Sequence, residues 1–191
     1  MFYRMHYKIP RIFRLAVFAS ALVPLPGLAE AQFEVINLEG TARIQRSQEK
    51  SWNDLEVGAK IRDNDIVETF FKTKLTVRYG RKNIAILGSN SKALFNIAET
   101  TVEEKSVTEA SFTLFGGGLF AKSIKDCHVS IYTSNGVAET SDGAVSAVVE
   151  AKSGETGFQV LGGSVAVRNI AQQKARRLGA GQTTMVLPGR Q

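Results

Sequence analysis

Cysteine and histidine are scarce in this 191-residue chain, which has one cysteine, Cys127, and two histidines. A single thiol forms no internal disulfide, so the fold must be stabilised by burial of apolar side chains. A zinc site needs three or four His, Cys or carboxylate ligands, which Cys127 and His128 alone do not supply. Neighbouring side chains on a strand point to opposite faces, so we expect a buried or half-buried Cys127, a surface His128 and no catalytic pair.

Long apolar runs are also missing. The longest one, residues 15–29, has 15 residues and is interrupted by Pro24 and Pro26, whereas spanning a membrane takes about 20 apolar residues. Four basic residues precede this run and the small residues Ala29 and Ala31 close it. This pattern is typical of a secretory signal peptide.

The signal-peptide interpretation predicts a leader over residues 1–31 that is cleaved before Gln32; retention of this segment as an anchor stays open as the alternative. The remaining residues, 32–191, would form a single domain in the periplasm or outside the cell, without a membrane span. Four basic residues and one acidic residue lie in the leader, so the net charge falls from +6 to +3 on cleavage. Such a charge gives no reason to expect a nucleic-acid partner.

A helical stripe is hard to find, whereas alternation of apolar and polar residues, typical of half-buried strands, is common. The polar segments 99–110 and 171–178 are expected to be an exposed loop, or the polar end of long strands, and a hairpin loop respectively. The pattern predicts an all-β fold. The expected strands are residues 33–38, 41–46, 74–79, 83–87, 92–97, 111–115, 128–133, 144–151, 158–161, 164–168 and 183–187.

Two glycine-rich stretches match each other without a gap, FTLFGGGLFA at 112–121 and FQVLGGSVAV at 158–167. A phosphate-binding loop would lead into a helix that carries Lys and Ser or Thr, and neither stretch does so. Both stretches instead continue into strand-like apolar residues. We interpret them as two equivalent corners of one folded β layer.

Candidate ligand-binding and catalytic clusters are weak. RDNDIVE at 62–68 lacks the glycine and terminal glutamate of a calcium loop and is expected to be a turn of solvated carboxylates. No acid is embedded in an apolar run that would raise its pKa, so we expect no catalytic residue, no cofactor and no metal. A basic group in and before the 171–178 segment has no interleaved aromatic and is expected to be solvated, with contact to lipopolysaccharide or another envelope polyanion as the weaker alternative. Its members are Arg168, Lys174, Arg176 and Arg177.

Six short motifs from residue 51 onward resemble, in the same order, those of the FecR-like domain family. They start with SWNDLEVGAKIRDNDIVET and end with RRLGAGQTTMV. Asn64-Asp65 replaces the family's usual Gly-Asp, and asparagine can adopt the positive φ that glycine supplies. The residues that carry the resemblance are Trp52, Gly58, Asp65, Thr69, Gly80, Gly117, Thr133, Gly163 and Gly181.

This resemblance implies a twisted, solenoid-like or sandwich β domain. The family's anti-sigma helical region, membrane helix and receptor-contacting domain have no counterpart in these motifs, so anti-sigma activity itself is not carried over. We expect a non-catalytic interaction or sensing module of the bacterial cell envelope, which binds another envelope protein through sheet edges or loops. An envelope polysaccharide or peptidoglycan is the alternative partner, and an enzyme is the third hypothesis.

Overall fold

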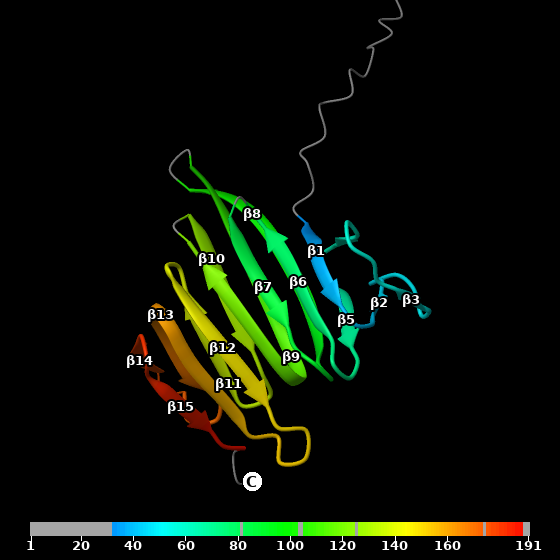
Figure 1. The fold of residues 1–191 in the computed structure, drawn as a ribbon. Coiled ribbons are helices and arrows are strands. Elements are labelled where there is room, and N and C mark those ends of the chain that lie inside the picture. Colours follow the sequence, from blue (N-terminus) through cyan, green and yellow to red (C-terminus); the bar gives the residue numbers. More distant parts are fainter. Residues whose placement is uncertain (1–31, 81, 103–104, 125, 174, 189–191) are drawn as a thin grey trace, which may run out of the picture. The chain divides into compact units, whose positions relative to one another are not determined.

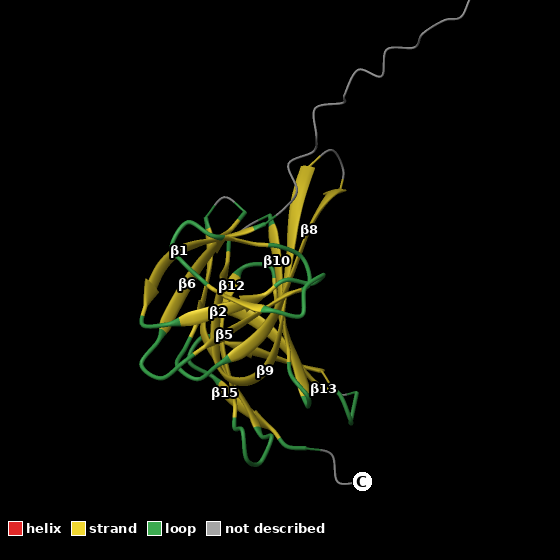
Figure 2. Ribbon diagram, turned by 90° about the vertical axis from the view of Figure 1, so that its right-hand side faces the viewer, coloured by secondary structure: helices red, strands yellow, loops and turns green. Residues whose placement is uncertain are grey.

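The computed structural model describes residues 32–188 except 81, 103–104, 125 and 174, so the predicted leader over 1–31 and Lys174 lie outside the described residues. The described residues belong to one compact unit, Ala31–Gln191. Across this part of the chain the secondary structure consists of strands joined by turns and loops, without a helix (Figure 2). None of these described segments is a helix long and apolar enough to cross a membrane.

The strand content confirms the all-β prediction. The described strands are β1 (Phe33–Glu39), β2 (Ala42–Gln45), β3 (Trp52–Asp54), β4 (Lys60–Ile61), β5 (Asp65–Thr69), β6 (Lys74–Tyr79), β7 (Asn83–Leu87), β8 (Lys92–Val102), β9 (Lys105–Ser123), β10 (Cys127–Tyr132), β11 (Gly136–Thr140), β12 (Gly143–Val149), β13 (Thr156–Asn169), β14 (Ala175–Gly179) and β15 (Thr183–Val186).

These strands form two sheets that share β9 and β13 (Figure 1). Sheet A has the order β4-β1-β6-β7-β9-β12-β13-β15. Sheet B has the order β3-β2-β5-β8-β9-β10-β11-β13-β14. Because β9 and β13 belong to both sheets, the strands β9, β10, β11, β13 and β12 close into a ring. The β9–β10 pair is parallel, and the other pairs are antiparallel.

The two glycine-rich stretches lie where β9 and β13 pass between the sheets. β9 pairs with β8 through Gly116 in sheet B and with β12 from Gly117 onward in sheet A. β13 passes the other way, pairing with β12 up to Gly163 in sheet A and with β14 from Ser164 in sheet B. The two-corner interpretation is therefore confirmed, with one correction: each corner is a bend within a continuous strand.

The core lies between the two sheets. Its centre is a cluster of four fully buried rings, with Phe33 and Tyr79 on sheet A and Phe95 and Phe112 on sheet B. Their centroids are 5.2–5.9 Å apart, and most pairs meet edge to face, the geometry that aromatic quadrupoles favour. The alternation of buried and exposed residues along each strand places these side chains inward.

Some predicted elements differ from the structure. Part of the segment 171–178, expected to be a loop, is the edge strand β14, and the short strands β3, β4, β5 and β11 were not expected. Within the segment 99–110, the described residues 99–102 and 105–110 form the polar ends of the two long strands β8 and β9, as the second alternative predicted. These two strands form a hairpin that extends beyond the rest of the sheets (Figure 2).

Candidate functional site

The five glycines that carry the sequence resemblance share one backbone feature. Gly58, Gly80, Gly117, Gly163 and Gly181 all have positive φ, between +54° and +88°. Residues other than glycine and asparagine rarely adopt this conformation, so backbone geometry accounts for the glycine at each of these positions. Asn64, which stands where the family usually has glycine, also has a positive φ of 63°.

The other signature residues make structural contacts. The Thr69 Oγ1 donates a 2.5 Å hydrogen bond to the Gly88 carbonyl, which ties the end of β5 to the β7–β8 connection. The Thr133 Oγ1 donates to the Gly136 carbonyl at 3.0 Å and closes the β10–β11 turn. Trp52, on β3, lies under the Arg43 guanidinium, whose carbon is 4.4 Å from the ring centroid. The signature residues thus lie at separate turns and edges.

Asp65 corrects one expectation, because it is buried and not a solvated carboxylate. Its Oδ2 accepts hydrogen bonds from the Arg46 Nη1 at 2.7 Å and from the Arg62 backbone N–H at 2.8 Å. Its Oδ1 accepts from the Ser47 backbone N–H at 3.1 Å. A buried carboxylate needs this number of partners, so Asp65 holds the β4–β5 turn against the 46–47 segment.

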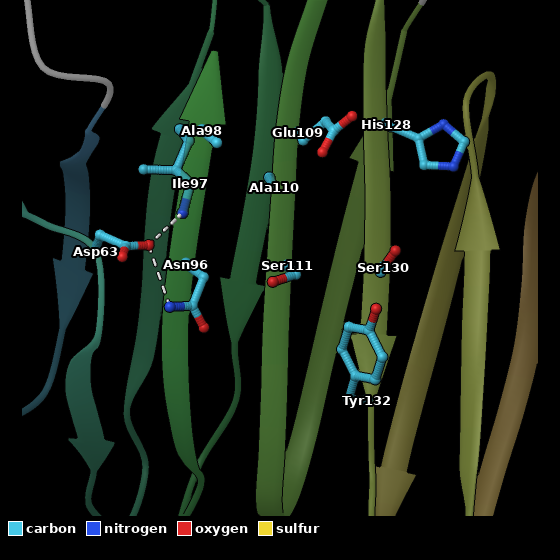
Figure 3. Close-up of a pocket in the computed structure, with 10 residues that line it drawn as sticks. All are labelled: Asp63, Asn96, Ile97, Ala98, Glu109, Ala110, Ser111, His128, Ser130 and Tyr132. Atoms are coloured by element: carbon cyan, nitrogen blue, oxygen red, sulfur yellow. Dashed lines mark hydrogen bonds between the residues drawn. The ribbon is translucent and has the colours of Figure 1, made fainter. Parts of the chain in front are cut away.

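A shallow trough of about 200 Å³ lies on the outer face of sheet B, across β8, β9 and β10. The pairing registers form two rows across it: Ala98, Glu109 and His128, and next to these Asn96, Ser111 and Ser130. Figure 3 shows the polar side chains of these rows, with Tyr132 beside Ser130. The floor is formed by small residues, which is why the sheet surface is hollow here.

Some of the polar groups in the trough are already paired with one another. The Asp63 Oδ1 already accepts hydrogen bonds from the Asn96 side chain and the Ile97 backbone N–H, both at 3.1 Å (Figure 3). His128 is exposed beside Glu109, while its neighbour Cys127 is buried on the other face, as the sequence predicts. Burial raises the pKa of the Cys127 thiol to about 11, which disfavours the reactive thiolate. Among the described residues, no three His, Cys, Asp or Glu side chains are grouped so as to hold a metal ion.

A second hollow, of about 380 Å³, lies between the edge strands β14 and β15, where sheets A and B end. The buried side chains of Val167 and Val186 line it, and Asn169, Arg176 and Met185 lie around them. In the described part of the chain, β14 and β15 each pair with β13 alone. Each of these strands therefore has an outer edge that can accept another strand.

The two C-terminal edges differ in chemistry. β14 carries Arg176 and Arg177, and charges on an edge strand oppose pairing with further strands. β15 has the sequence TTMV, without a charge, and the Met185 side chain is 58% exposed. At the other end of the sheets the edge strands β3 and β4 have only three and two residues. Of these four edge strands, β15 is thus the one that is both uncharged and long enough to pair with a further strand.

Sequence reasoning predicted the strand that became β15 but named no partner-binding residue. The hollow between β14 and β15 depends on the strand β14. The polar composition of 171–178 had led to the prediction of a loop there. The one sequence feature that could have indicated this strand is Leu178, an apolar residue that follows two arginines. Its side chain is buried in the structure. The basic group does not lie on one loop: Arg168 is half-buried on β13, and Arg176 and Arg177 are exposed, as expected, but on the strand β14.

No protein-family model matches the chain, and no curated protein matches it by sequence. Its fold is similar to two crystal structures, at 1.65 and 2.50 Å resolution, of a "putative anti-sigma factor" from Parabacteroides distasonis ATCC 8503. Each has a TM-score of 0.50 and 11–12% sequence identity, over 64% of this chain and 54% of the matched chain. The chain thus spans about half the length of these structures, and at this identity the similarity concerns the fold.

Proposed function

We propose that the chain is a FecR-like, non-catalytic interaction module that is exported to the bacterial cell envelope and binds an extended segment of another envelope protein along β15. The order of the sequence motifs supports the family assignment. The similarity to the Parabacteroides protein supports it independently at the level of the fold. The observation that carries the binding mode is the uncharged β15 edge beside a hollow lined by valines.

Backbone geometry defines which groups β15 offers to a partner. The Val160 N–H donates to the Gln182 carbonyl at 2.9 Å, just before β15 begins. In an antiparallel pair, alternate residues of the inner strand point their backbone groups to the same neighbour. Phe158 and Thr156 therefore bond toward Thr184 and Val186, their register partners. The backbone groups of Thr183 and Met185 consequently point outward.

The hollow between β14 and β15 indicates which kind of partner segment fits along β15. A strand added to β15 would place every second side chain near Val186 and Val167, which favours apolar residues at those positions. Arg176, which lines the hollow, favours an acidic residue in the same segment. We therefore expect a partner segment in which apolar and acidic side chains occur together in an extended conformation.

The test uses a photoreactive residue in place of Thr183 in the native envelope. Met185→Pro removes the outward N–H but keeps the inner ladder, because proline is tolerated on an edge strand. Met185→Thr changes the same side chain and keeps the N–H, so it is the matched control. We expect one discrete protein adduct with Met185→Thr and its loss with Met185→Pro. Equal adducts in both variants, or adducts with sugars alone, would contradict the proposal.

The alternative partner, an envelope polysaccharide or peptidoglycan, is favoured by one observation. Tyr132 is 37% exposed at the end of the trough, beside Ser130, and the amide of Asn96 lines the same trough two strands away. An aromatic ring in the same trough as hydroxyl and amide groups suits a sugar. Under this alternative, sedimentation with peptidoglycan would be lost in Tyr132→Ala and kept in Met185→Pro, the reverse of the result expected for strand addition.

A further inference from the structure

Aromatic side chains are exposed at one corner of the sheets, where β5, β8 and β9 meet the connections 70–73 and 88–91. Phe71 is 71% exposed, Phe115 52% and Phe70 40%, and Trp52 is half-buried beside them. We call this surface the aromatic corner. Its members are Trp52, Phe70, Phe71, Phe115, Lys72 and Lys92.

Backbone contacts hold the aromatic corner together although its residues are far apart in sequence. The Asn90 N–H donates to the Phe70 carbonyl at 3.2 Å, and the Lys72 N–H donates to the Ser89 Oγ at 2.8 Å. Lys92 is paired with Gly116, and Phe115 is the extra residue of the bulge between Gly116 and Leu114. The bulge turns the Phe115 side chain outward to the same side as Lys92.

The positive charges lie directly beside the rings. The Lys72 Nζ is 5.4 Å from the Phe71 ring centroid, and the Lys92 Nζ is 5.3 Å from the Trp52 centroid. The Arg43 guanidinium lies between Trp52 and Phe70 and is paired with Glu68 at 2.6 Å. That pair neutralises Glu68, and the charged members of the aromatic corner are Lys72 and Lys92.

Isolated exposed apolar residues need no explanation, but several aromatics gathered on one surface mark an interaction site. Aromatic rings flanked by lysines match an anionic membrane surface, which has an apolar boundary below a layer of negatively charged headgroups. The rings enter the boundary between headgroups and acyl chains, and each lysine near an anionic leaflet adds about fivefold to binding. Lys72 beside the exposed Phe71 and Lys92 beside the half-buried Trp52 supply the positive charge that such a surface attracts.

We infer that the aromatic corner docks on an anionic phospholipid surface, with Phe71 and Phe115 inserted among the headgroups. This inference goes beyond the proposed protein partner and does not depend on it. The β14–β15 end of the sheets and the β2, β3 and β5 strands lie on opposite sides of the described structure (Figure 1). Both surfaces can therefore be occupied at once.

The test uses Trp52 as the reporter, because it is the only tryptophan of the whole chain. The chain from Gln32 onward, the form expected after cleavage of the basic and apolar leader, is mixed with vesicles of phosphatidylcholine with or without phosphatidylglycerol, whose acyl chains carry bromine as a fluorescence quencher. We expect strong, salt-sensitive quenching with the anionic vesicles and little with the neutral ones. Equal quenching by both, or none with the anionic vesicles, would overturn the inference.

Single substitutions of exposed residues separate the corner from other sources of binding. Phe71→Ser and Phe115→Ser should each weaken binding to anionic vesicles by about tenfold. Lys72→Glu should weaken it by more than tenfold, since it replaces attraction by repulsion. Met185→Pro, at the opposite end, should change nothing. Binding that is unchanged in the three corner variants, or the same Trp52 response to a soluble anionic polysaccharide, would overturn the inference.

Discussion

Gly117 lies directly against Ser91. A Cβ on Gly117 would be 2.2 Å from the Ser91 Oγ and 2.6 Å from its Cα. The same hydroxyl accepts a hydrogen bond from the Gly118 N–H at 2.9 Å and donates one to the Gly118 carbonyl at 3.2 Å. Ser91 therefore clamps the bend at which β9 passes between the sheets, and the clamp has room only for glycine.

Gly117→Ala is expected to lower the free energy of unfolding by about 3 kcal/mol, because it adds a backbone clash to a strained positive φ. Gly116→Ala is the control: no atom lies within 4 Å of its Cβ position and its φ is not positive. This control should stay within about 1 kcal/mol of the wild type. Urea unfolding measures both, and equal stabilities would contradict the clamp.

Gly163→Ala tests the second bend. Its Cβ would be 2.1 Å from the Asp142 carbonyl oxygen, at a φ of +67°, so a loss of about 3 kcal/mol is expected. At the adjacent Gly162 the Cβ position is 3.8 Å from the Ala144 Cβ, an ordinary contact. Thermal unfolding should therefore separate the two variants. If Gly162→Ala is the more damaging, the assignment of the bend is wrong.

Asp65→Ala is expected to destabilise the fold by about 3 kcal/mol. The substitution leaves the Arg46 guanidinium and two backbone N–H groups without the carboxylate that now bonds them. Asp54→Ala, at an exposed position of β3, should cost less than about 0.5 kcal/mol. Chemical unfolding compares the two. A similar small loss in both would mean that water replaces the carboxylate.

Stability is expected to fall as the pH rises above 9. Burial raises the pKa of Cys127 from 9.0 to about 11, so between these values the unfolded chain loses this proton first. The folded state then holds more protons, and its stability decreases with rising pH, by about 1 kcal/mol from pH 8 to 10. Below pH 9 the thiol is protonated in both states, and its contribution to the free energy of unfolding is fully present.

Cys127→Ala removes this titration, so its stability should depend less on pH over the same interval. Burial also raises the pKa of Tyr79, which acts in the same direction at higher pH, and the measurement therefore stops at pH 10. Urea unfolding at pH 8, 9 and 10 gives the two curves. Parallel curves for the wild type and Cys127→Ala would refute the role of the thiol.

The candidate sites were less predictable than the strands. Phe70, Phe71 and Phe115 are unremarkable in sequence, and only the contacts of 70–73 with 88–91 and the β9 bulge expose them together. The trough requires the parallel register of β9 with β10, which places Glu109 beside His128. The sequence predicted a solvated Asp65 because its partner, Arg46, lies 19 residues away along the chain. Contacts of this kind leave no local pattern.

The sequence by itself determined the strand-rich fold, because alternation with a period of two can bury only one face of an extended chain. It also determined both bends, because a positive φ combined with close backbone contact admits glycine and little else. The tertiary structure alone decided which edges stay open, which carboxylate is buried and which aromatics remain exposed. These features depend on pairing between distant segments, and the energy of such pairing belongs to both partners and is not encoded in either segment alone.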